Sequence, residues 1–279
     1  MKHLFATWEE VYRRIKDRYL VLFLDYDGTL VPMMPRPDMA KLTARKKTII
    51  EKLSKQTDIK VVVISGRELK DVKKCVGIPE IVYAGNHGLE LEDPQIKHIH
   101  PAAVEFEAFV RKLVDRLKRA YTFLPEILIE GKTFSVSVHY RQVPEKKIEL
   151  AKMILLKEIG GYLGQSQVGL TEGKKVWEIR PPVAWNKGHT VTWLFGRIIA
   201  HIGERALPIY IGDDLTDEDA FRALKHRGIT IKVVNDPREE TAARYYLLSP
   251  NDAFEFLRRL IKMKEKETLH VRTRTHTGI

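Results

Sequence analysis

Short apolar runs separated by amphipathic stretches repeat along most of the chain. Five of these runs are rich in β-branched residues and end at a turn: residues 20–24, 59–64, 81–84, 208–212 and 229–234. Three stretches carry apolar residues at helical spacing: residues 40–55, 187–202 and 252–264. Strands that alternate with helices form a parallel sheet covered by helices. The pattern predicts an α/β fold with a doubly wound, mostly parallel, Rossmann-like core sheet.

Between residues 104 and 183 the pattern changes to helix, two strands, helix, two strands. Such a change of rhythm marks an inserted second domain. We therefore expect a core of residues 1–103 and 184–266, and a smaller α/β cap domain of residues 104–183. The last residues, 267–279, are polar, and we expect them to form a disordered tail.

Two segments of the insert alternate between apolar and polar residues, as half-buried strands do. In the first, the polar positions are Ser135, Ser137, His139 and Arg141. In the second, Lys174, Glu178 and Arg180 share a face if the strand starts at residue 174. We expect a sheet with one wet side. Ion pairs between the strands of the insert are an alternative use for these charges.

Composition and charge exclude several classes of protein. The chain has 279 residues, 44% of them hydrophobic, which is enough for one large core or two smaller ones. Its N-terminus meets charge too early for a signal peptide, and no apolar run is long enough to span a membrane. Cys75 is the only cysteine, which is typical of a reducing compartment. We expect a cytoplasmic protein.

The formal net charge of +11 raises the question of nucleic-acid binding. The basic residues are spread along the chain, and no nucleic-acid-binding module accompanies them. We therefore expect no nucleic-acid partner and no membrane partner. An anionic small molecule fits the charge better.

The first candidate functional motif is Asp25-Tyr26-Asp27-Gly28-Thr29-Leu30, directly after the apolar run 20–24. Asp and Gly are ordinary turn residues, so a simple turn is the alternative interpretation. However, open α/β sheets bind ligands where their strands end. Two carboxylates this close resist joint ionisation unless a cation or a proton intervenes. The motif predicts a metal site.

Further polar groups follow the other expected strands. They lie in Ser65-Gly66-Arg67, Gly85-Asn86-His87-Gly88 and Gly212-Asp213-Asp214, and Lys187 precedes a helix. A small hydroxyl beside a glycine lets backbone N–H groups approach an oxyanion. Paired Asp residues suit a hard cation. Each segment alone is also consistent with a solvated loop.

Taken together, these segments resemble the four ordered motifs of the haloacid dehalogenase-like phosphatases. Within that superfamily the chain is similar to the trehalose-6-phosphate phosphatases. The motifs that carry this similarity are residues 84–90, Glu172-Gly173-Lys174, Glu178-Ile179-Arg180-Pro181, Lys187-Gly188 and residues 212–221. The resemblance spans roughly residues 20–260, and it includes the insert, which controls substrate choice in that family.

The resemblance implies a mechanism. Asp25 is the nucleophile that forms an aspartyl phosphate, and Asp27 is the general acid and base. Mg²⁺ is held by Asp25, the main-chain carbonyl of Asp27 and Asp213, with Asp214 as a further candidate ligand. Either Asp214 or Asp217 can instead orient water or Lys187. Three groups stabilise the phosphoryl oxygens: Thr29, Ser65 and Lys187.

It also implies a substrate site for trehalose 6-phosphate. We expect Lys174 and Glu178, with Arg141 and Arg180, to contact sugar hydroxyls from the cap. The phosphate or the sugar would also meet Gly66, Arg67, Asn86 and His87. Sucrose 6-phosphate and mannosyl-3-phosphoglycerate are alternative substrates of related capped phosphatases.

A different class of function is a noncatalytic regulatory subunit of a trehalose-synthesis complex. The presence of Asp25, Asp27, Lys187 and Asp213 counts against it. Because the chain contains little beyond the core and the cap, we expect it to lack a synthase domain and to work as a free phosphatase. A trehalose-6-phosphate synthase is a candidate partner.

Overall fold

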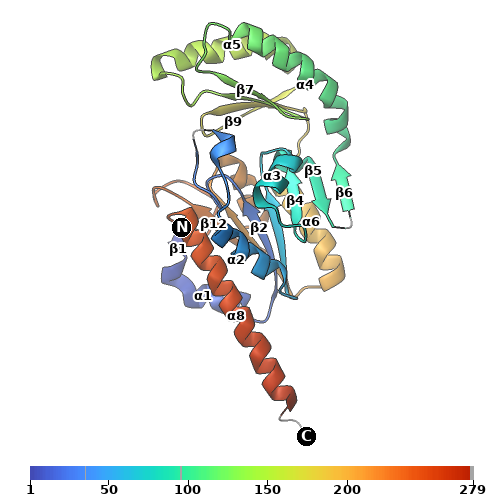
Figure 1. Ribbon diagram of the computed structural model, residues 1–279, viewed down its shortest axis with the longest axis vertical. Coiled ribbons are helices and arrows are strands. Elements are labelled where there is room, and N and C mark those ends of the chain that lie inside the picture. The colour runs from blue at the N-terminus through green and yellow to red at the C-terminus, as the bar shows by residue number, and fades with distance from the viewer. Residues whose placement is uncertain (35, 95, 277–279) are drawn as a thin grey trace.

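A computed structural model describes residues 1–34, 36–94 and 96–276. Its larger sheet has the strand order β1-β13-β12-β11-β2-β3-β4-β5-β6 and is parallel except for β5 and β6 (Figure 1). The strands are β1 (Lys2–His3), β2 (Tyr19–Asp25), β3 (Ile59–Ile64), β4 (Val82–Gly85), β5 (Glu90–Asp93), β6 (Ile96–Ile99), β11 (Ala206–Gly212), β12 (Ile229–Val233) and β13 (Tyr245–Leu247). The mostly parallel α/β core is confirmed.

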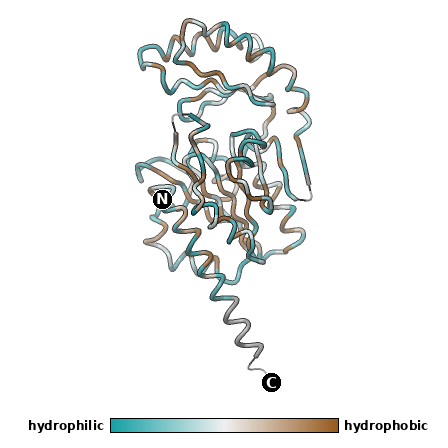
Figure 2. The backbone as a smooth tube through the Cα atoms, in the orientation of Figure 1, coloured by the Kyte–Doolittle hydropathy of each residue, from teal (hydrophilic) through white to brown (hydrophobic). Residues whose placement is uncertain are grey.

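Both faces of this sheet are covered by helices, because the central strands are apolar on both sides. Along β2, Leu20, Leu22 and Leu24 pack in one cluster, and Val21 and Phe23 pack in another. The first cluster includes apolar residues of α1 (Trp8–Ile15), α2 (Ala44–Ser54), α3 (Leu69–Val76) and α8 (Pro250–His276). The second includes residues of α6 (Lys187–Ile202) and α7 (Glu218–Leu224). Figure 2 shows the hydrophobic positions concentrated in the interior of this layered unit.

The order of the strands determines where a ligand can bind. From β2 the chain proceeds to β3 and β4 on one side, whereas β11 leads to β12 and β13 on the other. The sheet therefore has a topological switch point between β2 and β11, which is where open α/β sheets form a crevice. The first loop of the predicted site follows β2, and the acidic loop follows β11.

A second sheet lies above the carboxyl ends of the core strands (Figure 1). It is antiparallel, in the order β7-β8-β10-β9, with β7 (Leu128–Gly131), β8 (Val136–His139), β9 (Gly169–Gly173) and β10 (Val176–Arg180). Two long helices, α4 (Pro101–Ala120) and α5 (Glu145–Gly164), cover its outer face. Its other face turns toward the core.

The expected wet side of this second sheet is confirmed only in part. Ser135, Ser137 and Glu178 are buried, because loops of the core cover this part of the polar face, whereas Arg141 is exposed and His139 is half-buried. The apolar side chains on the opposite face, including Trp177 and Ile179, form a cluster with α4 and α5. Polar side chains on a covered face must find hydrogen-bond partners within the protein.

The expected polar tail is helical as far as His276, and its expected disorder stays a prediction. Helix α8 continues to His276, and residues 277–279 lie outside the described residues. Residues 265–276 contain neither proline nor glycine, and their Glu, Lys, Leu and Arg residues favour helix. Across the described parts of the chain, no helix combines the length and the apolar character needed to cross a membrane.

Candidate active site

The end of β2 and the loop after it bring the Asp25 carboxylate to the switch point and leave space for the Asp213 carboxylate. Asp25 is the last residue of β2 and is buried. Gly28 has φ = +84°, and a Cβ atom there would lie 2.1 Å from Oδ2 of Asp213. Only glycine meets both conditions without strain, since its lack of a Cβ allows positive φ and a close approach. The loop thus closes onto the end of β11.

A buried lysine joins two of the acidic groups. Lys187 Nζ lies 2.7 Å from Oδ1 of Asp25 and 2.6 Å from Oδ1 of Asp217. This lysine begins α6, whose N-terminus is capped by the side chain of Asn186. Burial would lower the pKa of Lys187, but Asp217 and Asp25 outweigh it and hold that pKa well above the ordinary value. The lysine is therefore a fixed positive charge beside Asp25.

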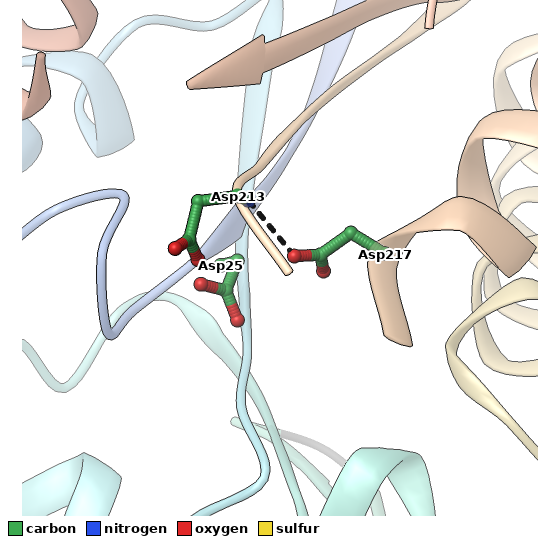
Figure 3. Close-up of side chains that lie close together, drawn as sticks. All are labelled: Asp25, Asp213 and Asp217. Atoms are coloured by element: carbon green, nitrogen blue, oxygen red, sulfur yellow. Dashed lines mark hydrogen bonds between the residues drawn. The ribbon is translucent and has the colours of Figure 1, made fainter. Parts of the chain in front are cut away.

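Asp217 is fully engaged within the protein. Besides Lys187, its carboxylate accepts hydrogen bonds from the Tyr210 hydroxyl at 2.6 Å and from the backbone N–H groups of Asp213 and Asp214 at 2.9 and 2.8 Å. Figure 3 shows Asp217 approaching Asp213 from the side, while Asp25 and Asp213 lie together. Asp217 is thus well placed to orient Lys187 and the acidic loop.

The acidic cluster has the chemistry of a cation site. Asp25, Asp213 and Asp217 each offer an oxygen, and these atoms lie within 4.8 Å of one another. Burial raises the pKa of Asp25 well above its ordinary value and raises that of Asp213 to about 7, in spite of the nearby lysines. Within the described part of the chain, Asp213 Oδ1 is buried without a hydrogen-bond partner. Negative charge is therefore left uncompensated, which suits a cation.

Asp27 and Asp214 occupy different surroundings from this cluster. Asp27 accepts two hydrogen bonds of 2.7 Å from Nε and Nη2 of Arg67, a bidentate pair. Asp214 caps the short helix Leu215–Asp217 by accepting the N–H of Leu215 at 2.6 Å. Arg67 therefore touches the proposed acid and base directly, and Asp214 has a structural role.

The loops after β2, β3 and β4 provide the other polar groups of the core. Ser65 is buried, and its Oγ accepts the N–H of Arg67 at 3.1 Å. Thr29 is buried too, and its Oγ1 has no partner among the described residues. Asn86 and His87 have φ values of +46° and +57°. Such conformations are costly outside glycine and concentrate at functional sites.

The second sheet faces these loops through Glu178. Its Oε1 accepts hydrogen bonds from Lys132 Nζ at 2.8 Å and from the Ser135 hydroxyl at 3.1 Å. Its Oε2 lies 2.5 Å from Nε2 of His87. Lys132 Nζ also donates to the carbonyl of Gly66 at 2.7 Å. One buried carboxylate thus ties the second sheet to two core loops.

The other expected cap residues are placed differently from the prediction. Lys174 lies in the turn between β9 and β10, so it does not share a strand face with Glu178 and Arg180. From this turn its Nζ reaches Oδ2 of Asp213 at 2.5 Å. Arg180 is buried and donates to the carbonyl of Trp185. Arg141 donates to the carbonyl of Lys174 at 2.8 Å.

One cavity gathers most of the predicted residues between the two sheets. Those that line it are Asp25, Asp27, Ser65, Gly66, Arg67, His87, Arg141, Lys174, Glu178, Lys187, Asp213 and Asp214. Thr29, Asn86 and Arg180 do not line it. The sequence prediction missed further lining residues: Met33, Met34, Glu130, Lys132, His139 and Thr216. Glu130 and Lys132 lie outside the quoted motifs and carried no signal of their own, whereas His139 was assigned to the polar face.

This arrangement defines the class of the protein. A buried aspartate after the first central strand, a lysine at the start of a helix and an acidic loop across the switch point make it a haloacid dehalogenase-like phosphatase. The comparisons with known proteins narrow the class further.

The family model for trehalose-phosphatase matches residues 23–251. Trehalose-phosphate phosphatase B of Arabidopsis thaliana is 32% identical over 273 residues, which cover 93% of this chain and 71% of the relative. A probable trehalose-phosphate phosphatase 3 of Oryza sativa is 34% identical and covers 93% and 74%. The C-terminal domain of C. albicans trehalose-6-phosphate phosphatase has a similar structure, with TM-score 0.77, 25% identity and coverage of 91% and 96%. The chain therefore belongs to the trehalose-phosphatase family.

Proposed function

We propose that this phosphatase hydrolyses trehalose 6-phosphate to trehalose and inorganic phosphate, a step of trehalose biosynthesis. The observation that carries the proposal is the single cavity that places Asp25, Lys187 and Asp213 at one end and polar groups of the second sheet at the other. The first group suits phosphoryl transfer, and the second suits sugar hydroxyls. Membership of the trehalose-phosphatase family supports the choice of sugar.

In the first step, a carboxylate oxygen of Asp25 attacks phosphorus in line. The bond between phosphorus and the sugar oxygen breaks, and the departing oxygen takes a proton from Asp27. Trehalose leaves, and Asp25 holds the phosphoryl group as an acyl phosphate. The charge of Lys187, 2.7 Å from Asp25, stabilises the anionic oxygens without having to move.

In the second step, water attacks the phosphoryl group and gives a proton to Asp27. Inorganic phosphate leaves, and Asp25 is free again. Asp27 thus acts first as an acid and then as a base, which divides one difficult hydrolysis into two displacements. Its bidentate contact with Arg67 must give way during this cycle, because Arg67 occupies both carboxylate oxygens and the transferred proton needs one of them. We assign Arg67 to orienting Asp27, in addition to its predicted contact with the substrate.

A Mg²⁺ ion fits the uncompensated carboxylates, and we propose that Asp25, Asp213 and the main-chain carbonyl of Asp27 hold it. When bound, the ion supplies positive charge to the phosphoryl oxygens and orients the substrate. The orphaned Oδ1 of Asp213 supports this assignment. Asp214 is a weaker ligand candidate than Asp213, since its carboxylate caps a short helix.

We propose that residues 104–183 form the cap domain that selects the sugar. In the structure, Glu178, Lys174 and Arg141 line the cavity from this side, and Lys132 and Glu130 add two charges that the sequence prediction lacked. Ser65 and Gly66 line the cavity from the core side, where we propose that the phosphate binds, whereas the contact of Thr29 with the phosphate stays a prediction. A sugar that leaves these buried polar groups unpaired would be rejected. Association with a trehalose-6-phosphate synthase and a cytoplasmic location stay predictions.

Phosphate release from a panel of sugar phosphates tests the proposal. The panel contains trehalose 6-phosphate, sucrose 6-phosphate, mannosyl-3-phosphoglycerate and glucose 6-phosphate, each with Mg²⁺ and with a chelator. We expect rapid release only from trehalose 6-phosphate, and only with the metal. Equal rates on every sugar would overturn the assigned substrate. A full rate in the chelator would overturn the cation site.

A further inference from the structure

The segment between β2 and α2 places two methionines beside the cavity. Met33 is 40% exposed, and Met34 is half-buried, where it packs against the main core cluster. Both line the cavity together with Ala40 of the same segment. Methionines exposed at the wall of a polar pocket leave apolar surface in water, and the mechanism above does not use them.

The cavity therefore has two chemically different walls. On the side of the second sheet, the lining side chains are mostly polar or charged: Glu130, Lys132, Ser137, His139, Arg141 and Glu178. On the side of the core, beyond the acidic cluster, the segment between β2 and α2 contributes the apolar side chains of Met33, Met34 and Ala40. Arg36 of the same segment also lines the cavity, with its side chain 62% exposed and paired with Asp38. A glucose ring has the same asymmetry, since its hydroxyl groups point outward at the edge while its C–H groups form an apolar face.

We propose that Met33 and Met34 form an apolar platform that packs against the C–H face of a glucose unit and so helps to select the substrate. The polar wall then receives the hydroxyl groups of the same unit. The proposal rests on the proposed function, because it assigns the platform to the sugar of that substrate. Methionine suits this task, since its unbranched thioether side chain adapts its shape to an irregular surface.

The platform acts on binding and not on the chemistry of the phosphoryl group. Pockets commonly combine an apolar surface, which supplies affinity, with a few polar groups that set orientation. Removing Met33 should therefore weaken the binding of a sugar phosphate more than that of a small phosphate that has no ring. Losing an apolar contact of this size in a pocket weakens selection of the sugar by about 10-fold. The effect should be somewhat smaller here, because Met33 is partly exposed.

The test compares Met33→Ala with Met39→Ala. Met39 belongs to the same segment and is 49% exposed, but it does not line the cavity. For Met33→Ala we expect KM for trehalose 6-phosphate to rise about 5- to 10-fold, with a much smaller change in kcat/KM for acetyl phosphate, which has no ring to pack on the platform. Met39→Ala should change neither, and Met33→Leu should restore most of the affinity.

A binding measurement separates this proposal from the proposed function. In the Asp25→Asn background, the Kd of trehalose 6-phosphate is measured by calorimetry with and without Met33→Ala. A weaker Kd with the alanine supports the platform. If the wild-type enzyme prefers trehalose 6-phosphate but Met33→Ala changes neither KM nor Kd, the platform is refuted and the function stands. If the wild-type enzyme does not act on trehalose 6-phosphate, the function and the platform both fail.

Discussion

The floor and the roof of the cavity are built in different ways. On the floor, Asp25, Lys187 and Asp213 stand at the ends of core elements, and each side chain is at most 7% exposed. On the roof, Lys132 and Lys174 extend from turns, while Glu178 projects from the face of a strand. Lys174 is 41% exposed, whereas Lys132 is 9% exposed. A floor fixed by sheet topology and a roof adjusted by turns suggest that chemistry and substrate choice can be changed separately.

The largest expected effect comes from a substitution on the floor. Asp25→Asn removes the nucleophile, so we expect activity to fall by more than about 10⁴-fold on every substrate, sugar or aryl. Phosphate release on both substrates measures the loss, and circular dichroism checks the fold. Asp219→Asn is a matched control, because Asp219 is partly exposed, pairs with Arg222 and does not line the cavity. An active Asp25→Asn enzyme would rule out covalent catalysis by this residue.

The floor could be predicted because its residues are tied to strand ends. Residues 20–24 and 208–212 read as buried strands, so the acids after them had to meet at one edge of the sheet. The structure brings Asp25 and Asp213 together there. The role of Asp217 was left open, because a choice between metal and lysine depends on side-chain contacts that sequence spacing does not specify.

The roof could be predicted only in outline. Alternation identified strands near residues 136–139 and 176–180, but it did not show that the core would cover their polar face. Starting the second strand at residue 174, two residues before its actual start at Val176, put Lys174 on the wrong element. Lys132 was missed because a lysine in a turn is usually solvated, and only the fold shows that Gly66 and Glu178 surround it.

Asp27→Asn gives a smaller effect that depends on the leaving group. The sugar alkoxide needs a proton to depart, so we expect kcat/KM for trehalose 6-phosphate to fall about 10²- to 10⁴-fold. p-Nitrophenolate departs without a proton, and its kcat/KM should fall far less. Asp38→Asn, at an exposed aspartate paired with Arg36, serves as the control. Equal losses on the two substrates would remove the acid role from Asp27.

Glu178→Gln tests the roof. The amide cannot balance the charge of Lys132, so we expect kcat/KM for trehalose 6-phosphate to fall about 10-fold, while that for p-nitrophenyl phosphate changes less than about twofold. Steady-state kinetics on both substrates measure the difference. Glu172→Gln is the matched control, since Glu172 lies on the neighbouring strand with its side chain 52% exposed. Equal losses of kcat/KM on both substrates would mean that Glu178 supports the structure of the site and does not recognise the sugar.

The smallest expected effect is a pH-dependent loss of stability in Glu178→Gln, which tests whether the charge of Glu178 holds the roof against the core. Burial would raise the pKa of Glu178, but His87 and Lys132 outweigh it and hold that pKa well below its ordinary value of 4.5. A carboxyl group with a depressed pKa in the folded state stabilises the protein above its unfolded pKa, and this stability is lost as the pH falls through the folded pKa. Glu178→Gln should therefore lower the free energy of unfolding by about 1–3 kcal/mol at pH 5.5.

Below about pH 4.5 the gap between wild type and Glu178→Gln should narrow, because Glu178 of the unfolded wild-type chain takes up a proton while folded Glu178 is still ionised, which favours unfolding. Urea unfolding at pH 5.5, 4.5 and 3.5 measures the gap, and Glu172→Gln should show little gap at any of these values. Lys187 of the floor holds its charge throughout this range, because its pKa lies well above the ordinary value. A gap that stays constant down to pH 3.5 would mean that the shape of Glu178, and not its charge, holds the second sheet against the core.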